Sequence, residues 1–206
     1  MYRRLKTLRK GGEENSMRTV RLTAAMILLL TTSACVPLPS LNPLWDEGHA
    51  VCEPALAGTW ISEDDDEIIT IMQTERDEYR MVYISGEEAS QYEVHAVRLE
   101  GRLFLDLCPD KALLEERLHG EAYMPLVTTH FFLRVVLEPD GLELASLDDE
   151  AIEKRLDRGE IDIPNARSAD GLLLTAQTDQ LQDLVARFAD DPDAWSELSR
   201  YRRCRE

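Results

Sequence analysis

The sequence contains no short motif of a known catalytic or metal site. No CxxC pair or Cys/His cluster occurs, so zinc is not predicted. No Gly-x-Ser-x-Gly or HExxH motif accompanies His95, His119 and His130, which we interpret as ordinary side chains. The acidic run 63–67 lacks the alternating spacing and the glycine of an EF-hand loop, and we interpret it as a solvated loop. We expect no enzyme activity, no cofactor and no metal.

The chain also lacks an apolar run long enough to span a bilayer. The longest, Leu22–Leu30, is far shorter than the roughly 20 residues needed. Arg18 and Arg21 precede it and small residues follow it, which is the order of a secretory signal peptide. Acidic residues at 13 and 14 do not suit the basic start of such a signal, so Met17 is the predicted initiator. Residues 1–34 are therefore predicted to be a signal peptide.

Cys35 ends this segment, directly after Thr31-Thr32-Ser33-Ala34. The arrangement resembles the signals of bacterial lipoproteins, although Thr32 stands where that family usually has leucine. The resemblance implies cleavage before Cys35, diacylation of its sulfur and a membrane contact through the acyl chains. Val36, in place of an aspartate, resembles sorting to the outer membrane, facing the periplasm, where two membranes exist. The alternative is an ordinary signal cut near Ala34, which leaves Cys35 as a free thiol.

Basic residues are scarce, with 23 Lys and Arg against 40 Asp and Glu. After Cys35 becomes the first residue, 16 basic and 38 acidic residues remain, a net charge of −22. Such a field repels nucleic acid and anionic lipid headgroups, so we exclude nucleic-acid partners. Export would also place three further cysteines in an oxidising compartment. Three pairings are open, and we favour a disulfide between Cys52 and Cys108, both expected at strand ends, over one with Cys204 in the arginine-rich tail.

The rest of the chain is predicted to form a tether and one domain. Residues 35–53, with three prolines up to Pro43, are expected to be an extended tether without regular structure. Residues 54–206 are predicted to be one β-rich domain with C-terminal helices from about residue 178. Alternating apolar residues predict strands at 67–73, 79–84, 92–97, 103–107, 131–137, 142–145 and 172–175. Ser85-Gly86, Glu100-Gly101 and Pro139-Asp140-Gly141 are typical of the turns that join hairpins. Helices are expected at 111–118, at 148–158, from Thr178 as N-cap, and from Asp191-Pro192, the last one carrying Trp195 and Leu198.

Many short antiparallel strands predict a mainly β (α+β) fold, a barrel or strongly curved sheet closed by C-terminal helices. Gly58-Thr59-Trp60 is similar to the Gly-x-Trp opening of lipocalins, which implies a lipocalin-like barrel. More broadly, the chain from the Pro-Ala-Leu-Ala-Gly-Thr-Trp opening to Leu174-Thr175-Ala176 resembles a group of uncharacterised bacterial lipoproteins. That group has no known activity to transfer.

Two function classes stay open. One is a lipid-anchored envelope protein that binds a small apolar ligand inside the barrel. The other is a structural or protein-interaction module of the envelope whose core is solid, with another envelope protein as its partner. Aromatic residues at alternating positions are expected to point inward and to form either the core or a ligand lining: Trp60, Tyr79, Tyr83, Tyr92, Phe104 and Phe132.

Overall fold

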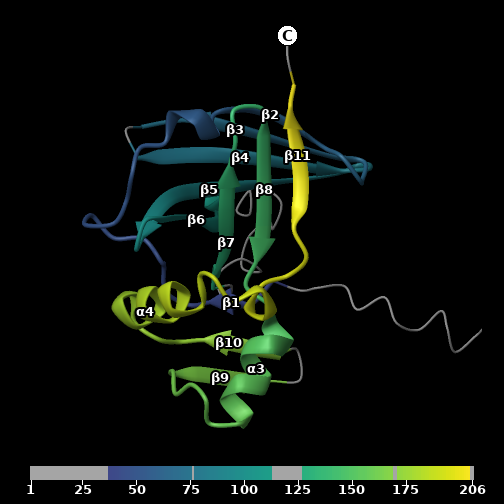
Figure 1. Ribbon diagram of the computed structural model, residues 1–206. Helices are drawn as coiled ribbons and strands as arrows, with labels where there is room; N and C mark the ends of the chain where they lie inside the picture. Colours follow the sequence, from purple (N-terminus) through teal and green to yellow (C-terminus); the bar gives the residue numbers. More distant parts are fainter. Residues whose placement is uncertain (1–36, 76, 113–126, 169–170, 205–206) are drawn as a thin grey trace, which may run out of the picture. The chain divides into compact units, whose positions relative to one another are not determined.

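The computed structural model describes residues 37–75, 77–112, 127–168 and 171–204 (Figure 1). Eight strands build a barrel: β2 (Gly58–Ser62), β3 (Glu67–Gln73), β4 (Glu78–Ser85), β5 (Glu88–Leu99), β6 (Arg102–Pro109), β7 (His130–Leu137), β8 (Gly141–Ser146) and β11 (Ser199–Arg203). The other elements are β1 (Pro39–Ser40), η1 (Pro54–Leu56), α3 (Asp149–Asp157), β9 (Asn165–Ser168), β10 (Gly171–Leu174), α4 (Thr178–Phe188) and η3 (Pro192–Ala194).

The barrel is an antiparallel meander that closes on itself. Each strand from β2 to β8 pairs with the next one, and β11 lies between β8 and β2. The expected mainly β, antiparallel, lipocalin-like barrel with helices is confirmed. The chain between β8 and β11 leaves the barrel, and in Figure 1 it carries α3, β9, β10 and α4 to one side of the strands.

Residue alternation determines which side chains fill the barrel. In β6, Leu103, Leu105 and Leu107 point inward, whereas Phe104 and Asp106 lie on the outer face. The inward set forms one contiguous core of Leu56, Trp60, Ile69, Ile71, Tyr79, Met81, Val94, Ala96, Leu103, Leu105, Leu107, Val135, Leu142, Leu144 and Tyr201. An eight-stranded barrel is just wide enough for side chains to fill, and these buried residues come from all eight of its strands.

A second core lies outside the barrel wall. Here α4 packs Leu181, Leu184 and Phe188 in the same cluster as Phe104 and Phe132 of the barrel. The helix keeps its apolar residues on one side, as the sequence predicts, and it begins at Thr178 with Gln177, not Thr178, as N-cap. The structure therefore has two layers of apolar packing that share the wall formed by β5 to β8.

The segment expected to be a free tether belongs to the fold from residue 37 onward. β1 pairs with both β7 and β10, and the main-chain N–H of Leu38 donates to Leu147 O at 3.2 Å. Leu38 is 1% exposed and Leu44 is fully buried in the outer core. The expectation of a solvated tether was wrong. The prolines favour extended chain, but burial of the Leu38 and Leu44 side chains holds this segment against the domain.

The C-terminal tail is the strand that closes the barrel, not a loose end. β11 pairs with β2 on one side and β8 on the other. The helix expected around Trp195 is only the short 3-10 turn η3, and Trp195 is buried against Phe104, with ring centroids 5.8 Å apart. The helix predicted at 148–158 is confirmed as α3, with Asp148 as N-cap. The helix predicted at 111–118 lies mostly outside the described residues.

Arg203, at the end of β11, connects that strand to β2 and to the chain at η1. Its guanidinium lies over the Trp60 ring, 4.2 Å from the centroid, and donates to Ala57 O at 2.9 Å and to Ala55 O. The Trp60 indole in turn donates to Leu56 O at 3.0 Å. A Cβ at Gly58, where φ is 151°, would lie 2.6 Å from Arg203 Nη1, so the first residue of the Gly-x-Trp motif leaves room for this arginine.

Within the described residues, no helix is both long and apolar enough to cross a membrane.

We predict that Arg203→Met destabilises the domain, because it removes two charge-assisted hydrogen bonds and the cation–π contact while keeping an apolar stem. The expected loss is about 2 kcal/mol. Arg202→Met is the matched control, because that neighbouring side chain is exposed. Urea unfolding followed by circular dichroism measures both. Equal midpoints for the two variants would contradict a closing role for Arg203.

Candidate functional site

The six aromatic residues do not share one lining. Trp60 and Tyr79 are buried in the barrel core, and Tyr83 and Tyr92 also point inward but stay partly exposed. Phe104 and Phe132 belong to the outer core, so the expectation that they point inward is wrong. The register explains the error. In β6 the leucines at 103, 105 and 107 occupy the inward positions, which places Phe104 on the opposite face.

A carboxylate lies among the inward-facing tyrosines at one end of the barrel. Glu67 accepts hydrogen bonds from the Tyr83 hydroxyl through Oε1 and from the Tyr201 hydroxyl through Oε2, the latter at 2.7 Å. Burial and the bond to Glu67 raise the pKa of Tyr83 to about 12 and also raise that of Tyr201. Both phenols stay protonated at neutral pH and donate to Glu67. These two hydrogen bonds connect β4 and β11 to β3.

Phe131 completes the partly exposed set at this end. Tyr92 pairs with Met81 and with Pro109, the last residue of β6, whereas Phe131 lies opposite Leu107 on β7. Together with Tyr83 they are inward-facing aromatics that the core does not bury completely. We call Tyr83, Tyr92, Phe131 and Glu67 the open-end cluster.

Asp106 organises a second polar group on the outer face of the barrel. Its Oδ1 accepts from His130 Nδ1 at 2.7 Å, and its Oδ2 accepts from the main-chain N–H of Leu44 at 2.6 Å and of Trp45 at 3.4 Å. The carboxylate is 1% exposed. A buried charge is stable only when several donors satisfy it, and here the donors fix the segment before β2 to the barrel wall.

His95 lies beside Asp106 in the β5–β6 register and stacks on Trp45, with ring centroids 3.9 Å apart. Burial lowers the pKa of His95 below its ordinary value, although the carboxylates of Glu78 and Asp106 oppose this shift. Ser40 lies opposite His130, but its hydroxyl donates to Asn42 O at 2.8 Å. The cluster therefore has the contacts of a structural clamp.

Sequence reasoning missed Asp106, yet a single carboxylate inside the apolar run Leu103–Leu107 was a signal of it.

The predicted disulfide is absent, because Cys52, Cys108 and Cys204 are free thiols in the structure. Cys52 accepts from Gln73 Nε2 at 3.3 Å, beside the end of β3. Cys108 lies on the outer face of β6, opposite Glu93, and burial raises the pKa of its thiol. Both residues are near strand ends, as expected, but Cys52 lies beside β3 and Cys108 is paired with β5. The predicted lipidation residue, Cys35, and His119 lie outside the described residues.

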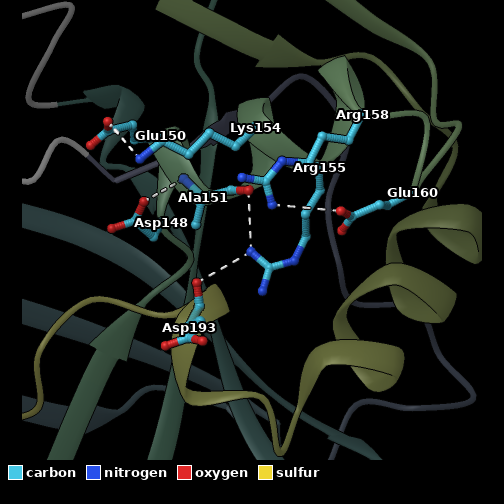
Figure 2. Close-up of a pocket in the computed structure, with 8 residues that line it drawn as sticks. All are labelled: Asp148, Glu150, Ala151, Lys154, Arg155, Arg158, Glu160 and Asp193. Carbon is cyan, nitrogen blue, oxygen red and sulfur yellow. Dashed lines mark hydrogen bonds and ion pairs between the residues drawn. The ribbon is translucent and has the colours of Figure 1, made fainter.

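Two pockets among the described residues lie on the segment between β8 and β11. The larger, about 380 Å³, is a polar groove of Asp148, Glu150, Ala151, Lys154, Arg155, Arg158, Glu160 and Asp193 (Figure 2). Arg155 crosses it, donating to Ala151 O and Asp193 O, each at 3.2 Å, and pairing with Asp191 at 2.7 Å. We call it the α3 groove. The smaller, about 250 Å³, lies between α4 and residues 161–163.

Over the part of the chain that the structure describes, no group of three or more His, Cys, Asp or Glu side chains is placed to hold a metal ion. The acidic residues 63–66 are exposed between β2 and β3, as a solvated loop.

No family model, no curated protein and no solved structure matches this chain.

Asp106→Ala is predicted to destabilise the domain strongly, because it leaves the buried N–H of Leu44, the part-buried N–H of Trp45 and His130 without their acceptor. Breaking a buried charged cluster of this kind costs about 3–5 kcal/mol. Asp64→Ala, in the exposed loop, should change stability by no more than about 0.5 kcal/mol. Urea unfolding of both variants, together with limited proteolysis between residues 41 and 53, provides the measurement. An unchanged cleavage pattern and midpoint in Asp106→Ala would show that the clamp is dispensable.

Proposed function

We propose that this chain is a lipid-anchored protein of the bacterial cell envelope whose barrel is a packed scaffold for interaction with another envelope protein. The proposal of a packed scaffold rests on the contiguous core of inward-facing side chains that runs from Leu56 of η1 to Tyr201 of β11. A drug-sized ligand needs a cavity of roughly 300–1,000 Å³. Trp60, Tyr79 and Met81 occupy that space in this barrel, each at most 2% exposed.

The anchoring part rests on the sequence. A basic stretch, an apolar run and small residues precede Cys35. Val36 supports sorting to the outer membrane, with the domain facing the periplasm. The acid excess keeps such a domain soluble and repels anionic surfaces, so the acyl chains supply the attachment.

Radiolabelled palmitate tests the anchor. Wild-type protein should incorporate the label and Cys35→Ser should not, because the cysteine sulfur is the acceptor. Cys204→Ser serves as the control for removal of an exposed thiol and should stay labelled. Label retained in Cys35→Ser would refute the anchor, and recovery of the labelled protein only in the inner-membrane fraction would refute the sorting.

A second candidate function is the binding of a small ligand at the open-end cluster. Tyr83, Tyr92 and Phe131 favour it, because they point inward yet remain partly exposed. These aromatic faces, with the Glu67 carboxylate bonded to Tyr83, suit a ligand that is apolar with a polar or cationic end.

Native mass spectrometry of the signal-free domain, expressed in a bacterium, separates the two functions. The packed scaffold predicts the mass of the protein alone. A discrete additional mass that disappears in Tyr92→Ala, but persists in a variant of the exposed Met72 to Ala, would favour the ligand function instead.

A further inference from the structure

The described fold begins two residues after the proposed lipidation site. Pro37 forms a β-bridge with Asp148, and Leu38 N–H donates to Leu147 O. Ser40, within β1, has no exposed surface. From residue 37 onward the chain is therefore held by the domain and cannot act as a spacer.

This spacing limits how far the domain can lie from the membrane. Two residues of fully extended chain reach at most about 7 Å. The polar headgroup region on each side of a bilayer is itself roughly 5–8 Å thick. Acyl chains on Cys35 must insert into the hydrocarbon layer, so the side of the domain that carries Pro37 is brought to the outer edge of the headgroups.

The surface beside Pro37 is the junction between β8 and α3. Asp148, the partner of Pro37, is also the first residue of the α3 groove, and Glu150 follows in the first turn of α3. The groove presents Lys154 and Arg158, whose side chains are 57% and 68% exposed and form ion pairs with Glu150 at 2.8 Å and Glu160 at 3.6 Å. In Figure 2, Glu150 and Lys154 lie on α3, and Arg158 and Glu160 follow the end of the helix.

Both charge signs on this surface fit a zwitterionic headgroup. A phosphate can accept from the two cations, and an ammonium or choline group can lie near the carboxylates. We propose that the β8–α3 junction and the α3 groove form a membrane-contact surface for zwitterionic phospholipid headgroups, holding the domain directly against the bilayer. This inference rests on the proposed lipid anchor.

Site-directed fluorescence tests the contact. The lipidated full protein, with Cys52, Cys108 and Cys204 changed to serine, receives one labelled cysteine, either Glu150→Cys or Glu138→Cys. Glu138 is the matched exposed control, because it lies in the turn before Gly141, about 20 Å along β8 from Leu147. The protein is reconstituted into vesicles of phosphatidylethanolamine and phosphatidylcholine that contain a phospholipid with a quencher on its headgroup.

Quenching at Glu150→Cys should exceed that at Glu138→Cys several-fold. Inserting a ten-residue Gly/Ser linker between Val36 and Pro37 should abolish the difference, because such a linker spans about 17 Å on average. Equal quenching at both sites in vesicle-bound protein with the native spacing would overturn the contact surface while leaving the anchor intact. Protein without acyl mass on Cys35 that stays in the aqueous fraction would overturn the anchor itself, and the contact surface with it.

Discussion

The contact of Arg203 with Trp60 is the constraint on which the barrel depends. A meander of seven strands leaves two unpaired edges, and β11 removes both by pairing with β8 and β2. Arg203 then attaches the end of β11 to the chain at η1 and to the Trp60 ring of β2. Because β11 is distant from β8 in sequence, this local contact also fixes where the intervening chain must leave and rejoin the barrel.

The intervening chain is stabilised by the same wall that encloses the barrel core. β5 to β8 bury leucines on one side and Phe104, Val97 and Phe132 on the other. The outer layer gains Trp195, whose indole donates to Phe188 O at 2.8 Å, and the segment fixed by Asp106. Packing on both faces makes these strands unusually apolar, which is why their alternation is weak in the sequence.

The sequence was informative where local rules operate. Turns at Ser85-Gly86, Glu100-Gly101 and Pro139-Asp140-Gly141 predicted three hairpins that the structure confirms, and Glu100 and the glycines at 86 and 101 have the positive φ of such turns. It was uninformative where distant partners decide. Ser199–Arg203 has only Tyr201 as an apolar inward residue. It forms a strand because the edges of β8 and β2 are both free to pair with it. Asp106 likewise depends on N–H groups 61 and 62 residues away.

The burial of Leu38 and Leu44 changes what an anchor at Cys35 would mean. A free tether would let the domain sample the space above the membrane, with any of its faces available to a partner. Because the chain is pinned at Pro37, an anchor at Cys35 would instead hold one side of the domain toward the lipid and leave the opposite side for a protein partner. A partner of a domain anchored in this way would have to approach close to the same leaflet, because the domain could not extend toward it.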